Sequence, residues 1–173
     1  MTERLKTAWR NEFAPLVGDR RGLRPVLFFL PDWWPGRHAA FAYFNVIAIG
    51  PGLVGAPEPV RRYILGHELG HIDRHHTNGQ VLYWLGVLAA VLLGRMLPPA
   101  FHLAPICLVL IVAVLWITRG EAKREFEADD EAAARYGDHT VITGLTWMQS
   151  RRATPVPKLN ALRLERRRDH ARV

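Results

Sequence analysis

The pattern of apolar and polar positions divides the chain into a mixed first part, a long apolar stretch and a charged last part. Residues 81–117 contain only two strongly polar side chains, Arg95 and His102, and Pro98-Pro99 interrupt the stretch near its middle. The two pieces, as helices, would be roughly 25 and 27 Å long, close to the ~30 Å hydrocarbon core of a bilayer. We therefore predict a hairpin of two transmembrane helices, in preference to a buried hairpin inside a soluble protein.

The rest of the chain shows helical and strand periodicities. Residues 1–18 have apolar side chains at helical spacing, and we expect this helix to dock on the domain rather than lie in the membrane interface. Residues 26–30 and 41–49 predict strands. A helix is expected from Pro57 toward a stop signal at Asn78-Gly79, and further helices at about 120–136 and 140–152. The fold class is therefore α+β, mostly α.

This pattern predicts one small domain with the membrane hairpin inserted into it. Residues 1–79 form its first part, 80–118 the hairpin, and 119–173 its second part with a basic end. That end segment has a thin apolar face, so we expect a solvated helix, with contact to acidic lipid head groups as the alternative.

The net charge of +7 lies on both sides of the apolar stretch. Residues 1–80 carry 10 Lys/Arg and residues 118–173 carry 12, whereas Arg95 alone lies near the hairpin turn. The positive-inside rule then predicts an integral protein of the inner membrane, with both flanks and both termini cytoplasmic. Anionic lipid is a more plausible partner than nucleic acid, which we do not expect to bind. The single Cys107 excludes an intramolecular disulfide.

The chemistry of the chain centres on His67-Glu68-Leu69-Gly70-His71, a His-Glu-x-x-His sequence on a predicted helix. Two histidines at i and i+4 lie one turn apart on one face, so both imidazoles can bind one Zn²⁺. Glu68 lies on the adjoining face, where it can take a proton from water at the metal. The motif predicts one catalytic zinc per chain, and it makes the small domain a zincin-like catalytic domain with a short sheet and zinc-binding helices.

A catalytic zinc normally has a third protein ligand and one water. The acidic cluster at residues 121–131 is the obvious source, because Glu121, Glu125 and Asp129 share one helix face and Ala128 and Ala132 beside them permit close approach. Spacing alone favours Glu125 only weakly. Other acidic residues of the cluster fall mostly on the other side and suit solvent: Glu127, Asp130 and Glu131.

Three segments together resemble the HtpX and CAAX-prenyl-protease family of membrane zinc metallopeptidases, which are gluzincins. They are AFAYFNVIAIGPGLV, then GHELGHIDRHH, and, after the apolar insertion, KREFEADDEAA. The resemblance covers about residues 25–152. By position in the family motifs, it implies that His67 and His71 are zinc ligands, Glu68 the catalytic base and Glu125 the third ligand. Asp129 matches the aspartate that orients a ligating histidine.

The chain departs from the family near its end, where many members carry a His-Pro element followed by an arginine. This chain lacks that histidine, so the group that stabilises the oxyanion is open, with His139 and Arg163 as candidates. Two further histidines follow the motif. His75 continues the His67–His71 face but is expected to end the helix or lie at an interface, and His76 lies off that face.

The predicted function is a zinc metalloendopeptidase that cleaves membrane-associated or misfolded proteins at the cytosolic membrane surface. Its mechanism would have Glu68 activate a zinc-bound water and pass the proton to the leaving amine. An extended peptide substrate could add to an edge of the strand at 41–49. The alternative is a non-catalytic membrane sensor or adaptor of the same fold that retains zinc, although a purely structural site has no need of Glu68.

Overall fold

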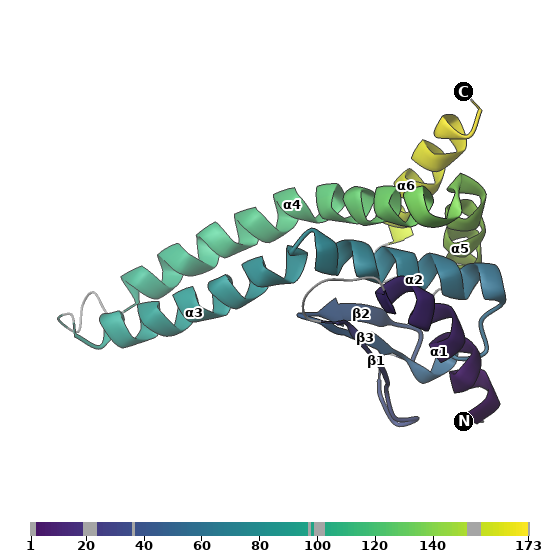
Figure 1. Ribbon diagram of the computed structural model, residues 1–173. Helices are drawn as coiled ribbons and strands as arrows, with labels where there is room; N and C mark the ends of the chain where they lie inside the picture. Colours follow the sequence, from purple (N-terminus) through teal and green to yellow (C-terminus); the bar gives the residue numbers. More distant parts are fainter. Residues whose placement is uncertain are drawn as a thin grey trace.

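A computed structural model of the protein describes residues 3–18, 24–35, 37–96, 98, 103–151 and 157–172. Within these residues the fold is mostly helical with one small sheet, which confirms the predicted α+β class (Figure 1). The elements in chain order are α1 (Glu3–Gly18), β1 (Val26–Phe29), β2 (Ala40–Tyr43), β3 (Val46–Ile49), the 3-10 turn η1 (Pro51–Leu53), α2 (Glu58–Asp73), α3 (His76–Gly94), α4 (Ala104–Tyr136), α5 (Asp138–Ser150) and α6 (Pro157–His170).

The sheet has the strand order β1-β3-β2, with β1 parallel and β2 antiparallel to the central strand β3. The prediction of one strand over residues 41–49 is wrong, because the chain reverses between Tyr43 and Val46, and Phe44 adopts a φ of 51°. Asn45 is a residue type that favours turns, and the reversal lets the two halves satisfy each other's main-chain groups. As a result β2 is an edge strand of the sheet.

The two faces of this sheet lie in different surroundings. The inner face contributes Ile47 and Ile49, both fully buried, to the core. The outer face carries large apolar side chains that are exposed to solvent, namely Val26, Phe28, Phe41, Tyr43 and Val46. The turn between β2 and β3 adds the exposed Phe44. Among the described residues, this is an apolar surface outside the core.

Helix α2 is the centre of the body, and most of its residues are buried against the sheet, α4 and α5. Helix α1 packs on the same core through Trp9 and Phe13, and the Trp9 indole N–H donates a hydrogen bond to the Val54 carbonyl at 3.1 Å. The expected docking of residues 1–18 on the domain is thereby confirmed. Helix α5 approaches α2 where Gly144 lies against the Tyr63 ring, with no room for a Cβ atom.

Helix α3 and the first half of α4, up to residue 119, lie side by side and project from the body; we call this pair the arm (Figure 1). The predicted stop at Asn78-Gly79 is wrong, because α2 ends at Asp73 and α3 already begins at His76. His75 breaks the helix with a left-handed φ of 53°. Helix α4 runs unbroken through residue 120, so the second apolar helix and the acidic helix are one element.

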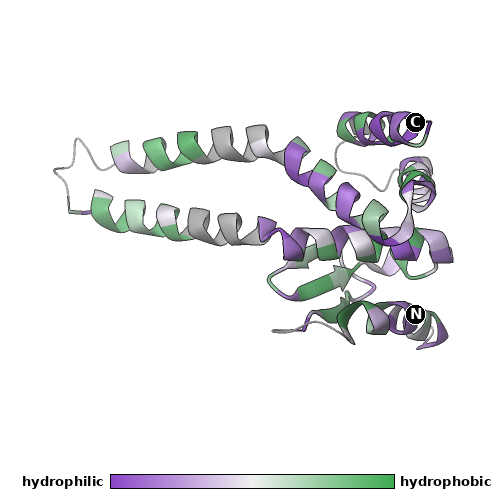
Figure 2. Cartoon of the chain, turned by 45° about the horizontal axis from the view of Figure 1, so that its top comes forward, coloured by the Kyte–Doolittle hydropathy of each residue, from purple (hydrophilic) through white to green (hydrophobic). Residues whose placement is uncertain are grey.

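The described residues of the arm are mostly hydrophobic (Figure 2). Leucines on both helices are more than half exposed, among them Leu85, Leu88, Leu92 and Leu108. Over the part of the chain that the structure describes, no helix combines the length and apolar character needed to cross a membrane. The helical hairpin is thus present, while its insertion into a membrane stays a prediction.

Helix α6 corrects the expectation of a solvated end segment. One of its faces packs on α5 and α4, and Asn160, Arg163, Leu164 and Arg167 are buried there. The two buried arginines are tolerated because they are paired: Arg167 bonds to Asp130 and Asp138, and Arg163 enters the site described below.

Candidate metal centre

Helix α2 brings the first three candidate residues together. His67 and His71 are one helical turn apart on one face, with their Nε2 atoms 3.2 Å from each other, and both rings lie beside α4. Glu68 is buried on the adjoining face, toward β2. The helical setting that the sequence predicted for the motif is therefore present.

The approach of α4 to α2 depends on small residues at the crossing. A Cβ atom on Gly66 would lie 3.1 Å from the Ala132 Cα, and one on Gly70 would lie 3.0 Å from the Ala128 Cα. Glycines on α2 facing alanines on α4 let the two backbones come close together. This contact brings the carboxylates of α4 within reach of the histidines on α2.

Glu125 completes a triangle of donor atoms with the two histidines. Its Oε2 lies 3.3 Å from His67 Nε2, and its Oε1 lies 3.4 Å from His71 Nε2. The three residues form the one group of possible metal ligands found among the described residues. Ligands 2.0–2.1 Å from a tetrahedral zinc ion lie roughly 3.3 Å apart, so the spacing fits that ion, and a His₂Glu set leaves a fourth position open.

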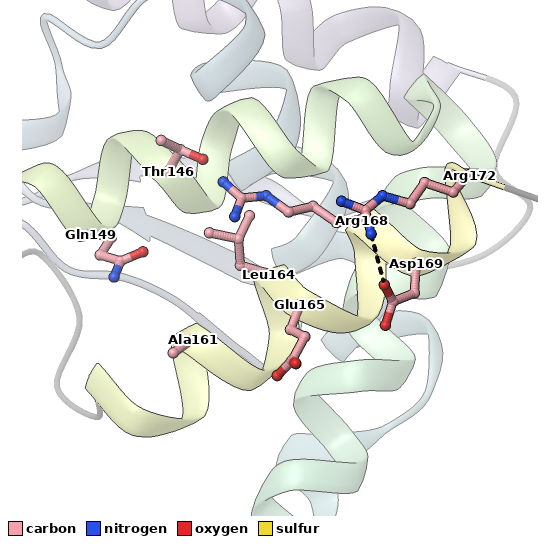
Figure 3. Close-up of a pocket in the computed structure, with 8 residues that line it drawn as sticks. All are labelled: Thr146, Gln149, Ala161, Leu164, Glu165, Arg168, Asp169 and Arg172. Atoms are coloured by element: carbon pink, nitrogen blue, oxygen red, sulfur yellow. Dashed lines mark ion pairs between the residues drawn. The ribbon is translucent and has the colours of Figure 1, made fainter.

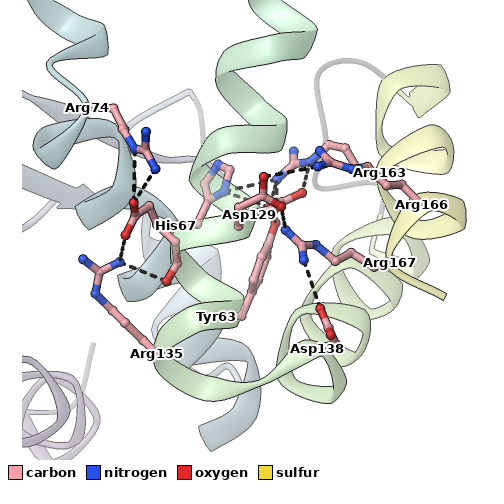
Figure 4. A network of polar contacts seen from close by, with 11 residues as sticks. Tyr63, His67, Arg74, Asp129, Arg135, Asp138, Arg163, Arg166 and Arg167 are labelled. Carbon is pink, nitrogen blue, oxygen red and sulfur yellow. Dashed lines mark hydrogen bonds and ion pairs between the residues drawn. The ribbon is translucent and has the colours of Figure 1, made fainter. Parts of the chain in front are cut away.

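A buried polar network holds His67 from behind (Figure 4). Asp129 Oδ1 lies 3.0 Å from His67 Nδ1, and Asp129 is almost fully buried. The Tyr63 hydroxyl donates a hydrogen bond to the same carboxylate at 3.2 Å. A carboxylate at Nδ1 fixes the ring so that Nε2 points at the metal position, which is the arrangement expected of Asp129.

Arg163 of α6, one of the two candidates for stabilising the oxyanion, completes this network. Its Nε and Nη2 donate to the two oxygens of Asp129 at 2.8 and 2.7 Å, and its Nη1 lies 2.7 Å from Glu125 Oε2. Nη2 also donates to the Tyr63 hydroxyl at 2.7 Å. The guanidinium therefore holds the carboxylates of Asp129 and Glu125 in place. Its action on an oxyanion stays a prediction. His139, the other candidate, lies exposed in the first turn of α5.

The network sets the charge of these groups in the metal-free protein. Burial and the Arg163 charge act against a protonated His67, but hydrogen bonds to Asp129 and Glu125 outweigh them and raise its pKa to about 9. Burial acts to raise the pKa of Glu125, yet hydrogen bonds from His67 and His71 hold it well below its ordinary value. In the same way Asp129 has a strongly lowered pKa, mainly because Arg163 bonds to it against the effect of burial. Both carboxylates are ionised, as metal binding and histidine orientation require.

Glu68 has the opposite character. Its burial raises the pKa of the carboxyl above its ordinary value, although the neighbouring histidines act to lower it. The main chain of Ala42 on β2 donates a hydrogen bond to it. A carboxylate with a raised pKa beside the metal ligands is suited to take up and return a proton.

Three residues of the site were not expected from the sequence. His76, which lies off the motif's helical face, is 2.8 Å from His71 Nδ1 through its own Nδ1. Glu127, expected in solvent, lies with its Oε2 3.1 Å from His76 Nε2. Tyr63, which was not singled out from the sequence, lies one turn before His67 and donates to Asp129. Its position at i−4 from His67 was the one available signal.

An open pocket of about 610 Å³ lies between α5 and α6, and none of the metal-centre residues lines it (Figure 3). Apolar and charged side chains share its wall, and Arg172 pairs with Asp169 across 3.8 Å. The pocket is thus separate from the chemistry of the metal centre.

A His-Glu-x-x-His helix, a carboxylate from a second helix and a buried glutamate beside them define a metallopeptidase centre. The chain belongs to peptidase family M48, whose family model matches residues 37–149. This confirms the predicted relationship to the zinc metallopeptidases of the HtpX and CAAX-protease type. The match includes α2, the arm and α4 but excludes α6, so the place of Arg163 rests on the geometry alone. No curated protein and no solved structure gives a significant match to the chain.

Proposed function

We propose that this protein is a membrane-bound, zinc-dependent endopeptidase that cleaves membrane-associated or misfolded proteins at the cytosolic membrane surface. The observation that carries the proposal is the triangle of His67, His71 and Glu125, with the buried Glu68 beside it. A purely structural site would need the triangle but not the glutamate. Membership of a peptidase family supports the same reaction class.

The residues of the chain have distinct tasks in peptide hydrolysis. His67, His71 and Glu125 would hold a zinc ion. As a Lewis acid, the ion would polarise the peptide carbonyl and lower the pKa of water. Glu68 takes the proton of the attacking water and returns it to the leaving amine nitrogen. Arg163 and Asp129 keep Glu125 and His67 in position while this happens.

Strand β2 supplies a means of holding the substrate. In its hairpin the Gly50 N–H donates to the Ala39 carbonyl, so Ala39 and Gly50 form a hydrogen-bonded pair. Because such pairs alternate along an antiparallel ladder, the main-chain groups of Ala40 and Ala42 point to the free edge, and of these the Ala42 N–H donates to Glu68. An extended peptide added there lies along α2 near Glu68, and main-chain bonds would bind it with little sequence preference.

The exposed apolar surfaces support attachment to a membrane. The arm carries leucines that no described residue covers, and a soluble protein rarely exposes a continuous apolar surface of this kind. The β2–β3 turn, with Phe44 exposed, lies at the same end of α2 as the arm, where aromatic side chains meet lipid head groups.

The proposed side of the membrane follows from charge. Lys and Arg number 10 before the apolar stretch and 12 after it, against Arg95 alone near the turn of the arm. The positive-inside rule places both flanks, and with them the metal centre, in the cytosol. Cysteines at positions 2, 100 and 172 of a Cys107→Ser protein test this. Position 100 should react with an impermeant reagent from outside, and reaction of either end from outside would contradict the proposal.

The activity is tested with detergent-purified protein and a mixed proteome, with and without a zinc chelator. We expect cleavage that the chelator abolishes and added zinc restores. Glu68→Gln should bind a stoichiometric amount of zinc and lose about 10²–10⁴-fold in kcat, the usual contribution of a general base. His67→Ala and His71→Ala should lose zinc and cleavage together. Zinc binding without cleavage in the wild type would favour the alternative, a sensor or adaptor.

A further inference from the structure

The two histidines of the triangle have different groups in contact with their Nδ1 atoms, on the side of the ring away from the metal position. His67 has the carboxylate of Asp129 on its Nδ1 at 3.0 Å. His71 has another imidazole in the equivalent place, with His76 Nδ1 at 2.8 Å from His71 Nδ1. His76 in turn contacts Glu127, whose Oε2 lies 3.1 Å from His76 Nε2. Each of the two histidines is therefore linked to a carboxylate of α4. His67 contacts Asp129 directly, and His71 is linked to Glu127 through His76.

The break between α2 and α3 produces this contact. His75 adopts the left-handed conformation, and α3 starts at the next residue, so the His76 ring stands edge-on to the His71 ring with centroids 5.1 Å apart. An unbroken helix would carry His76 away from the face of His71. The His76 side chain is only 11% exposed, and Glu127 reaches it from α4.

The atoms of this chain are compatible with one arrangement of protons. A histidine that binds a metal through Nε2 carries its hydrogen on Nδ1, so His71 donates to His76 Nδ1. His76 must then carry its own hydrogen on Nε2, where it donates to Glu127. Every donor has an acceptor, and both rings are neutral.

We propose that His76 and Glu127 are positioning residues that fix the tautomer and orientation of His71 for metal binding. The inference rests on the proposed zinc site and adds to it the support of the second histidine. Hydrogen bonds of this kind to a ligating histidine raise metal affinity by about 10–100-fold. Because His76 is the first residue of α3, the base of the arm becomes part of the metal centre.

The test measures zinc affinity by competition with a chromophoric chelator, on full-length protein in detergent. His76→Ala and Glu127→Ala should each weaken zinc binding about 10–100-fold. His76→Gln should recover part of the loss, because an amide can accept from His71 and donate to Glu127. Lys123→Ala is the matched control, since it removes the other ion-pair partner of Glu127 at 3.8 Å and should leave affinity within about twofold.

A second measurement separates positioning from general loss of structure. The Co²⁺-loaded protein should show an altered visible spectrum in His76→Ala, with the wild-type spectrum largely regained in His76→Gln. Circular dichroism of the metal-free variants should stay unchanged. Wild-type zinc affinity in both His76→Ala and Glu127→Ala would overturn the inference and leave the proposed function standing. Failure of the wild type to bind zinc would instead overturn the proposed function.

Discussion

Helix α4 passes through two different regions of the molecule within one unbroken element. In its second half, Ala128, Asp129 and Ala132 are buried against α2, where small side chains allow close contact and Asp129 pairs with Arg163. In its first half, Leu108 and Ile111 are more than half exposed in the arm. The body is thus defined by specific polar contacts, whereas the described arm is defined by apolar composition.

This difference indicates how each region tolerates change. In the body, the metal centre depends on three kinds of residue: the metal ligands, the groups that orient them and the glycines that let α4 approach α2. A substitution at any of these positions should disturb the site. In the arm, the exposed leucines are not packed in the core, so one large apolar side chain can replace another there with little effect on stability. The sequence of residues 76–119 contains no Asp or Glu, so the arm adds no carboxylate to the metal centre. Substitutions in the body and in the arm should therefore differ in their effects on zinc affinity and stability.

The largest effect is expected at the acidic residues of α4. Glu125→Ala should lower zinc affinity most, because Glu125 alone among them contributes an atom to the triangle. Asp129→Ala should cost about 10–100-fold through loss of its hold on His67. Glu131→Ala is the control, since it pairs with Arg74 and Arg135 away from the ligands. Equal zinc loss in the Glu131 and Glu125 variants, measured by competition titration, would remove the assignment.

The sequence predicted much of this centre and missed the parts that depend on tertiary contacts. The i, i+4 histidines and the small residues of α4 are local signals, so the two histidine ligands and the helix crossing were foreseeable. Spacing favoured Glu125 only weakly, and the family resemblance assigned it as the third ligand. The role of His76 depends on one left-handed residue, His75, which no local pattern marks. Arg163 reaches the site only because α6 docks on α5 and α4. A thin apolar face gave no indication of that docking.

The strand prediction failed for a related reason. Apart from Asn45, residues 41–49 are apolar on both faces, so alternation could not reveal that the chain reverses at Phe44. A chain reversal does not require a change in the apolar composition of the segment. It changes only the pairing, so that β2 and β3 pair with each other. In the arm, by contrast, Pro98 and the apolar runs on either side of it were enough to locate two helices. The described residues leave many apolar side chains of these helices exposed.

The next effect concerns the stability of the metal-free body as a function of pH. The pKa of His67 is raised to about 9, so the stability contributed by its protonated form is present below about pH 6.5 and is lost as the pH rises through 9. We expect a loss on the order of 3 kcal/mol over this window, seen as a falling Tm. The zinc-loaded protein should not show it. A flat profile for the metal-free wild type would contradict the network, and His67→Gln serves as the flat control.

A smaller effect is expected at the helix crossing. Gly70→Ala puts a Cβ atom 3.0 Å from the Ala128 Cα, so α4 must shift, and we expect destabilisation of about 1–3 kcal/mol with weaker zinc binding. Gly86→Ala in the arm is the matched control, because nothing lies within 4 Å of its Cβ position. The higher helix propensity of alanine should leave that variant equally or slightly more stable. Similar losses of Tm in both variants would remove the contrast between body and arm.

The smallest effect is expected on the surface of the arm. Leu92 is 58% exposed, so in detergent Leu92→Ala should change the free energy of unfolding by less than about 0.5 kcal/mol. Leu69 on α2 is fully buried, and Leu69→Ala should cost about 2–5 kcal/mol because it leaves a cavity in the core. Thermal unfolding of the two variants under the same conditions measures both. If Leu92→Ala destabilised the protein as much as Leu69→Ala, the arm would be a packed part of the body and not a surface left for lipid.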